Sequence, residues 1–356
     1  MTILSSISES KTIPFNKDNL NWGVLGTARI AAKAVIPALK ASRRNVVTAI
    51  ASRDLTRAQQ FAQTNGIQKA YGSYEELIRD PEIDAVYIPL PNSEHAPWAI
   101  KAMEAGKHVL VEKPFALNAD AAQLMVATSL EHSVLLMEAF MYRYHSRFEE
   151  VMDIVQGGSL GQLRFIQSTF SFQLTNPNDY RLSAPLGGGA LYDLGCYCVN
   201  FQRLLVGREP RRVQALSYMG STNVDLQMSG TLDFGEQVFT HFDVAFNAAP
   251  QQYTRIIGTE GVLSFEKSFN PGNEASEAYL HKGSETKRFK FKREDAYQKM
   301  VEHFYNVVAS KEAPRFPLSD AVNNLVVMDA LFQSAASGGN IISLIATNQS
   351  DGGTRE

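Results

Sequence analysis

The sequence has little cysteine and no long apolar run. Its 356 residues include only two cysteines, Cys196 and Cys198. A disulfide between positions so close would be strained, and a zinc site would need a second ligand pair. No apolar run reaches the roughly 18 residues of a transmembrane helix, and the polar, serine-rich start lacks the basic and apolar regions of a signal peptide. We therefore expect reduced, packed cysteines in a cytoplasmic protein without membrane contact.

Neither positive nor negative charge is in large excess. Lys plus Arg number 34 and Asp plus Glu number 37, so the formal net charge is −3. Nucleic acids and anionic membranes attract proteins with a clear excess of positive charge. This chain has no such excess, so neither is an expected partner. The hydrophobic share of 44% and the charged share of 20% are those of a globular protein. The length predicts about two domains.

Strands and helices alternate along the first part of the chain. Strands are predicted at 21–25, 46–51, 84–88, 108–111 and 133–137, and helices at 29–41, 54–65, 74–79, 94–105 and 118–131. Parallel strands need such helical crossovers. The order therefore predicts an α/β Rossmann fold, a doubly wound parallel sheet.

The pattern changes after about residue 150. Alternating apolar residues predict strands at 163–172, 211–218, 224–234, 236–246 and 253–267, and helices are expected near 190, 294–309 and 319–337. Gly235 and Glu236 suit a hairpin turn between two of these strands. The second half therefore predicts an α+β domain with a large, mostly antiparallel open sheet.

These patterns divide the chain into four parts. We expect an N-terminal extension at 1–20, an NAD(P)-binding Rossmann domain at 21–145, a C-terminal substrate-binding and oligomerisation domain at 146–346, and a disordered tail at 347–356.

The predicted helices are too few to cover both faces of the second sheet. One of its strands carries Val238, Thr240, Phe242 and Val244, which puts apolar residues on one face. We expect one face to pack on helices and the other to leave an apolar patch. Such a patch predicts a homodimer or a higher homo-oligomer.

A loop of small residues follows the first predicted strand. The segment 26–31 fits G-x-(G/A)-x-x-(G/A), a pattern that lets backbone approach a pyrophosphate at a helix N-terminus. Two alanines replace glycines here, so a tight turn without a ligand is the alternative. The candidate cofactor-binding residues of this loop are Gly26, Thr27, Ala28, Arg29 and Ile30.

The end of the second strand bears on the choice between NADP and NAD. NAD sites usually place a carboxylate there for the ribose 2′-hydroxyl, whereas this chain has Ser52 and Arg53, with Arg57 one helical turn later. A guanidinium suits the 2′-phosphate of NADP. The pattern favours NADP. NAD remains the alternative, with Asp54 on the ribose.

A second set of polar residues suits proton transfer. Glu112 and Lys113 follow the strand at 108–111, at the edge where parallel sheets bind ligands. After the triple glycine at 187–189, Asp193 and Tyr197 lie four positions apart and so share a helical face. Tyr197 as a packed aromatic and Asp193 as a first-turn acid is the equally weighted alternative.

The quoted segments match a known family. The chain resembles the glucose–fructose oxidoreductase, inositol dehydrogenase and rhizopine-catabolism (Gfo/Idh/MocA) family from about Asn21 to Ile345. The resemblance depends on WGVLGTARIA at 22–31, AGKHVLVEKPFALN at 105–118 and GGGALYDLGCY at 187–197. Further segments, 135–145 and 317–331, look like the branch of dimeric dihydrodiol dehydrogenase and NADP-linked xylose dehydrogenase.

The resemblance implies roles for individual residues. Lys113, Asp193 and Tyr197 would be catalytic, and tyrosine in place of histidine at position 197 argues against inositol as substrate. Leu90, Pro91, Asn92, His95 and Glu112 would join Lys113 at the cofactor, and Tyr142, Arg143, Tyr180 and Arg181 would join the catalytic residues at the substrate. His95 in a polar loop and Tyr142 in the core are the alternatives. No metal is needed, because the cofactor carries the hydride.

The expected function is an NADP-dependent oxidoreductase acting on a sugar, polyol or diol, and most specifically an aldose 1-dehydrogenase. We expect Tyr197 to accept the hydroxyl proton. Burial alone would raise the pKa of its phenol, so the Lys113 ammonium and the cationic nicotinamide ring are expected beside it to lower that pKa. A trans-dihydrodiol dehydrogenase, a sugar–sugar oxidoreductase with tightly held NADP and a non-catalytic sugar or cofactor sensor are the alternatives.

Overall fold

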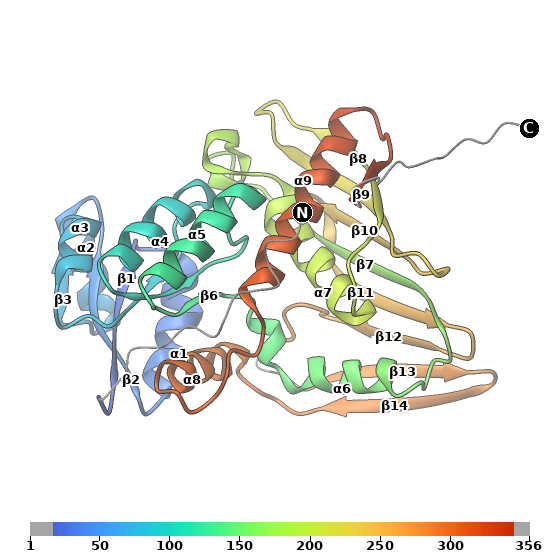
Figure 1. Ribbon diagram of the computed structural model, residues 1–356, viewed down its shortest axis with the longest axis horizontal. Coiled ribbons are helices and arrows are strands. Elements are labelled where there is room, and N and C mark those ends of the chain that lie inside the picture. The colour runs from blue at the N-terminus through green and yellow to red at the C-terminus, as the bar shows by residue number, and fades with distance from the viewer. Residues whose placement is uncertain (1–16, 273, 345–356) are drawn as a thin grey trace, which may run out of the picture.

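Two sheets organise the computed structural model, which describes residues 17–272 and 274–344 (Figure 1). Most of the expected N-terminal extension and the whole expected tail at 347–356 lie outside the described residues. One sheet is parallel and the other mostly antiparallel, which confirms the fold class predicted from the sequence.

The N-terminal sheet has six parallel strands in the order β3-β2-β1-β4-β5-β6. Their bounds are β1 Leu20–Leu25, β2 Asn45–Ala51, β3 Lys69–Tyr71, β4 Ala85–Ile88, β5 His108–Val111 and β6 Leu136–Glu138. The strand order reverses between β1 and β4, so the carboxyl ends of these strands border the ligand crevice of a doubly wound sheet. The sequence pattern missed β3, which is short and only half-buried.

Side-chain caps begin several helices of this domain. Asp54, Ser73 and Asn118 accept hydrogen bonds from backbone N–H groups three residues later. The helices are α1 Ile36–Ala41, α2 Leu55–Asn65, α3 Tyr74–Arg79, α4 His95–Glu104 and α5 Ala119–Glu131. A π-helical turn at Ala31–Val35 leads into α1. This turn, which the periodicity did not reveal, directly follows the candidate cofactor loop.

The C-terminal sheet has nine strands in the order β14-β13-β12-β11-β7-β10-β9-β8-β15. Their bounds are β7 Leu163–Gln173, β8 Arg212–Met219, β9 Asp225–Asp233, β10 Phe239–Ala245, β11 Asn247–Gly258, β12 Val262–Glu266, β13 Ser276–Lys282, β14 Glu285–Phe291 and β15 Ile342–Ser343. Only β7 and β10 pair in parallel. The single strand predicted at 253–267 is two strands, and the charged β13 and β14 were not predicted.

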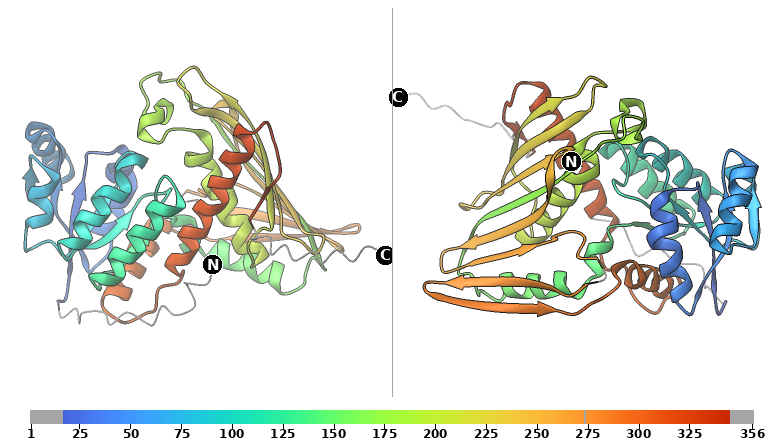
Figure 2. Two further views of the ribbon diagram at one scale, coloured as in Figure 1. Left: turned by 45° about the horizontal axis from the view of Figure 1, so that its top comes forward. Right: turned by 180° about the vertical axis from the view of Figure 1, so that it is seen from behind.

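Helices cover one face of this sheet. They are α6 Ser146–Gln156, α7 Cys196–Val206 and α9 Leu318–Ala336, and Figure 2 shows α7 and α9 between the two sheets. The fourth helix of this half is α8 Ala296–Val308. Thr240, Phe242 and Val244 are buried under the helices, so these residues do not form an open patch. The opposite face carries Phe165 and Phe239, which are 46% and 41% exposed.

Helix α8 lies far along the chain but packs on the N-terminal domain. The Phe304 ring lies 4.7 Å from the Trp22 ring of β1, and the Asn45 amide of β2 donates to the Val301 carbonyl at 3.4 Å. The boundary expected at residue 146 therefore separates sequence patterns but not spatial units. Cys196 and Cys198 are both buried and form no disulfide.

Candidate active site

The candidate cofactor loop fits a dinucleotide by its shape. Gly26 has φ 93°, and a Cβ on it would approach the Leu90 side chain to 2.7 Å, so a larger residue is excluded there. Residues 27–30 after it are accessible. The glycine turn and the accessible loop after it suit a close approach of backbone to a pyrophosphate, the role that the sequence predicts.

The end of β2 leaves Arg53 free to meet a phosphate. The Asp54 carboxylate accepts the Arg57 backbone N–H at 3.2 Å as the cap of α2. Ser52 is buried, whereas Arg53 is exposed. Burial raises the pKa of the Tyr74 phenol, and the guanidinium groups of Arg53 and Arg57 oppose that shift. Tyr74, which the sequence reasoning missed, thus lies beside both arginines.

Lys113 and Asp193 meet across the domain boundary. The Lys113 Nζ donates to the Asp193 Oδ1 at 2.7 Å and to the Asp193 carbonyl at 2.9 Å, and the Lys113–Pro114 peptide bond is cis. The other carboxylate oxygen accepts from the Arg181 Nε at 2.7 Å. Asp193 therefore holds two cations at the carboxyl end of β5, and it contacts Lys113 as an orienting group.

The charges of this cluster follow from its ion pairs. Burial raises the pKa of the Asp193 carboxyl, but Lys113 and Arg181 outweigh it and bring the value down to about 2. Burial opposes the Lys113 charge, yet Asp193 raises its pKa well above the usual value. At neutral pH the site therefore holds a carboxylate and an ammonium, and Lys113 donates hydrogen bonds. Burial raises the pKa of Glu112, which accepts a hydrogen bond from the Tyr87 hydroxyl at 2.5 Å.

Tyr197 lies beneath Lys113. The Lys113 Nζ is 5.1 Å from the centre of the Tyr197 ring, and the hydroxyl lies 3.9 Å from the Met141 Sδ. Burial raises the pKa of this phenol well above its usual value, and Lys113 only partly opposes the shift. Lys113 thus acts on this pKa in the expected direction, but desolvation outweighs its charge. Tyr197 is a neutral phenol at neutral pH.

A π-helical turn at Leu191–Gly195 presents Asp193. The Leu191 N–H donates to the Asp225 carboxylate at 2.7 Å, and the Tyr192 hydroxyl donates to the Leu117 carbonyl at 2.6 Å. Gly189 has φ 125°, and a Cβ there would lie 2.0 Å from the Asp225 Oδ1. The triple glycine thus permits the close packing that fixes this turn, and π turns of this kind often mark functional sites.

The loop after β4 contacts the C-terminal domain. The Asn92 amide donates to the Gly187 carbonyl at 2.7 Å, which joins this loop to the triple glycine. His95 is fully buried, with its ring nitrogens 2.8 Å from the Pro114 carbonyl oxygen and 2.9 Å from that of Leu90. Burial lowers its pKa to about 4. His95 therefore links two loops of the site and does not face the cofactor crevice, while Pro91 is half-buried beside it.

Two expected substrate residues belong to the core. The Tyr142 hydroxyl and the Arg143 Nε both donate to the Asn200 Oδ1, at 2.5 and 2.8 Å. The Arg143 Nη2 also lies 2.7 Å from the Asp320 Oδ2. Both side chains are buried, so this correction assigns them to a polar network that joins the two halves of the chain. Tyr180, in contrast, is half-buried beside Arg181, whose guanidinium lies 4.8 Å from its ring centre.

Other kinds of site are not in evidence within the described residues. No group of three or more His, Cys, Asp or Glu side chains could hold a metal ion in the part of the chain that the structure describes. No helix among residues 17–272 and 274–344 has the length and apolar character needed to cross a bilayer.

The fold and the site together define an oxidoreductase that binds a dinucleotide in its N-terminal domain. A family model described as an oxidoreductase family with an NAD-binding Rossmann fold matches residues 20–140, and one for the GFO/IDH/MocA C-terminal domain matches 148–264. The chain belongs to the Gfo/Idh/MocA oxidoreductase family, which confirms the resemblance found in the sequence.

Characterised relatives include the predicted branch. The D-xylose 1-dehydrogenase (NADP+) 2 of Haloferax volcanii is 38% identical over 323 residues, which cover 89% of this chain and 98% of that protein. The trans-1,2-dihydrobenzene-1,2-diol dehydrogenase of Xenopus tropicalis is 31% identical, over 88% and 97%. A crystal structure of a 3-ketoreductase from Actinomadura kijaniata with NADP and TDP-benzene has 30% identity and a TM-score of 0.85, over 89% and 98%.

Proposed function

We propose that the chain is an NADP-dependent oxidoreductase of a cyclic sugar or polyol, and most specifically an aldose 1-dehydrogenase. The ion pair between Lys113 and Asp193 at the crevice of a Rossmann sheet, with the Tyr197 ring beneath it, carries the proposal. The loop at 26–30 and the end of β2 would hold the cofactor, which supplies the hydride acceptor when bound.

The side chains divide the remaining work. Two of the three N–H groups of the Lys113 ammonium donate to Asp193, which leaves one for a substrate oxygen. The Tyr197 phenol exchanges a proton with that oxygen. Because the phenol is protonated at neutral pH, it is ready to donate to a carbonyl in reduction, and oxidation requires its deprotonated form.

Similar proteins support this assignment. Two further structures of the Actinomadura kijaniata ketoreductase carry substitutions of a lysine and a tyrosine, and the two positions are as far apart in that chain as Lys113 and Tyr197 are here. The Haloferax volcanii relative is named for D-xylose and NADP+. The dihydrodiol dehydrogenases among the relatives keep diol oxidation as the second candidate function.

A panel assay tests the proposed function. We expect the purified protein to reduce NADP+ with D-xylose or another aldose, and the lactone or its hydrolysed acid should appear in equal amount. Turnover of a trans-dihydrodiol in preference to every aldose would favour the second candidate. A protein that binds NADP+ but turns over no aldose, polyol or diol in either direction would be a sensor, and the proposal would be wrong.

Arg53→Ala should lose most of its preference for NADP. The exposed guanidinium follows Ser52 at the end of β2, and the adjacent carboxylate, that of Asp54, caps a helix. Loss of a charge-assisted phosphate contact should lower kcat/KM for NADP by about 10- to 100-fold, with little change for NAD. Arg79→Ala, an exposed arginine on α3, is the matched control. Equal kcat/KM for NADP in Arg53→Ala and wild type would contradict the assignment.

We also propose that two copies associate through the open face of the C-terminal sheet. The exposed side chains of this face include Phe165, Leu216, Tyr218, Phe239 and Tyr279, which are 37–62% exposed. His241, Asp243 and Arg255 lie among them, so the face offers charges of both signs to a second copy of itself. Such a self-complementary surface suits a two-fold dimer.

Light scattering tests this association. We expect twice the 39.4 kDa chain mass at micromolar concentration and a shift to the monomer mass in the double variant Phe165→Glu with Tyr218→Glu, because burying unpaired carboxylates is costly. Leu124→Glu places the same charge on an exposed leucine of α5, away from the sheet, and should keep the wild-type mass. A monomeric wild-type protein would overturn the proposal.

The two cysteines bear on the cellular compartment of the protein. The buried, unbonded Cys196 and Cys198 support a proposed site of action in a reducing environment, the cytoplasm.

A further inference from the structure

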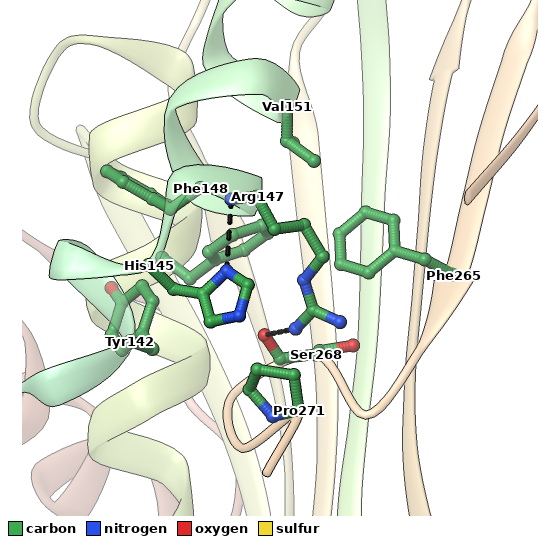
Figure 3. A pocket seen from close by; sticks show the side chains of 9 residues that line it. Tyr142, His145, Arg147, Phe148, Val151, Phe265, Ser268 and Pro271 are labelled. Atoms are coloured by element: carbon green, nitrogen blue, oxygen red, sulfur yellow. Dashed lines mark hydrogen bonds between the residues drawn. The ribbon is translucent and has the colours of Figure 1, made fainter. Parts of the chain in front are cut away.

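A buried arginine outside the catalytic cluster makes an unusual set of contacts. Arg147 of α6 is 3% exposed. Its guanidinium donates to three successive backbone carbonyls, those of Glu266 at 3.3 Å, Lys267 at 2.5 Å and Ser268 at 2.8 Å, and to the Ser276 hydroxyl at 3.3 Å. Figure 3 shows the side chain reaching from its helix to the Ser268 backbone. One side chain thus fixes the backbone that follows β12.

Burying the Arg147 guanidinium costs free energy unless its hydrogen bonds compensate. Among the described residues no carboxylate forms an ion pair with Arg147, and burial alone lowers its pKa to about 10. The Phe265 ring, 5.5 Å from the guanidinium, adds only a cation–π contact. A buried charge without a counter-ion is stabilised mainly by its hydrogen bonds. The free energy of that arrangement therefore depends on the carbonyls of residues 266–268.

The backbone that Arg147 holds is itself strained. Lys267 has φ 51°, a left-handed conformation that a residue with a side chain rarely adopts. Its N–H donates to the Gln252 carbonyl at 2.8 Å, and the Phe269 N–H donates to the Gln252 side chain at 3.3 Å. Strain of this kind persists where the surroundings fix it, and it gathers near functional sites.

The strained segment ends in a ring that packs on the catalytic tyrosine. Phe269 is fully buried, and its ring centre lies 5.6 Å from that of Tyr197 and 5.5 Å from that of Phe170. Among residues 17–272 and 274–344, the Tyr197 hydroxyl has only the weak Met141 sulfur contact at 3.9 Å. Aromatic packing, and not a strong hydrogen bond, therefore sets where the phenol points.

The cavity beside Arg147 is too small to be a ligand site. Its volume of about 10 Å³ suits at most one water molecule. The His145 Nε2 and the Ser268 Oγ border it without a hydrogen-bond partner among the described residues. Arg147 thus ties α6 to this segment through hydrogen bonds to the carbonyls of residues 266–268.

We propose that Arg147 is a positioning residue, which holds the 266–269 segment so that Phe269 keeps the Tyr197 phenol in place and dry. The proposal rests on the proposed role of Tyr197 in proton transfer. It assigns a function to a residue 50 positions before Tyr197 that touches neither Lys113 nor the substrate crevice.

Arg147→Met tests this positioning. Loss of the three carbonyl contacts should free Phe269 and lower kcat by about 10- to 100-fold, as small misplacements near the chemistry do, while KM for NADP stays near the wild-type value. Arg147→Lys keeps a donor for the carbonyls and should recover part of kcat. Leu263→Ala, a fully buried residue of β12, controls for stability and should lower Tm without the loss in kcat.

A spectroscopic titration separates this inference from the proposed function. The ultraviolet phenolate signal of Tyr197 is the difference between each protein and its Tyr197→Phe counterpart. Water entering beside Tyr197 in Arg147→Met should move its pKa down toward the ordinary value near 10. An unchanged Tyr197 titration with only a lower Tm would overturn the positioning role. No turnover in wild type would overturn the proposed function instead. The titration would still show whether Arg147 positions Tyr197.

Discussion

Lys113→Met should lower kcat by about 10²–10³-fold or more, the range seen when a preorganised donor to a reacting oxygen is lost. The Lys113 ammonium holds Asp193 through two hydrogen bonds and keeps one donor for a substrate oxygen. Its charge also opposes the rise that burial causes in the pKa of Tyr197. Methionine keeps much of the stem but removes the charge, so both effects are lost together. KM for NADP should change far less, because the proposed phosphate site is the loop after β1.

A second buried lysine provides the control for this variant. Lys107 is 8% exposed and donates to the carbonyls of Asp80 and Ile83 at 2.8 and 2.7 Å. Lys107→Met should therefore lower the free energy of unfolding by leaving carbonyls unpaired, while kcat stays near the wild-type value. Equal kcat in Lys113→Met and wild type, measured at saturating substrate, would remove Lys113 from the chemistry.

The parts of the site that could be predicted lie at the ends of parallel strands. Gly26, Arg53 and Lys113 each follow a buried strand, and strands of a doubly wound sheet bring their carboxyl ends to one edge. Local pattern and the topology rule therefore predict that these residues share one edge of the sheet. The Gly235–Glu236 turn between β9 and β10 was also found, since both residues have positive φ.

The parts that could not be predicted depend on contacts between distant segments. Nothing local in the sequence shows that Arg143 reaches Asp320, or that Asn92 reaches Gly187. An arginine and an asparagine in a polar loop suit a ligand site equally well. The network that buries Arg143 exists only once α9 has packed against α7, so its structural role appears only in the folded chain.

The pKa of Tyr197 is a second case of this kind. The sequence placed an ammonium near a phenol and so predicted a lowered pKa. The structure surrounds the same ring with Phe140, Phe170 and Phe269 at 5.1–5.8 Å. Desolvation of the phenolate by these rings outweighs Lys113. The sign of the shift therefore depended on residues from three separate segments.

Tyr197→Phe should lower kcat by about 10²–10⁴-fold, the usual loss when a general acid or base is removed. The substitution keeps the ring against Phe269 and deletes only the hydroxyl, so stability and KM for NADP should stay close to wild type. The Tyr197 hydroxyl makes only a weak contact with the Met141 sulfur, and its removal leaves no strong hydrogen-bond partner behind. Cys198→Ala, a change at another buried position of α7, is the control and should keep kcat.

The pH profile gives the sharper test of Tyr197. Because burial holds its pKa above the ordinary value, the rate of oxidation should rise with pH from neutral into the alkaline range, as the phenolate population grows. Reduction, which needs the protonated phenol, should be steady at neutral pH and fall in the same alkaline range. Lys113→Met removes the charge that partly opposes the shift, so the rising limb of its residual oxidation should move to still higher pH. In Tyr197→Phe the limb should disappear, and a residual rate with an unchanged limb would assign the proton transfer to another group.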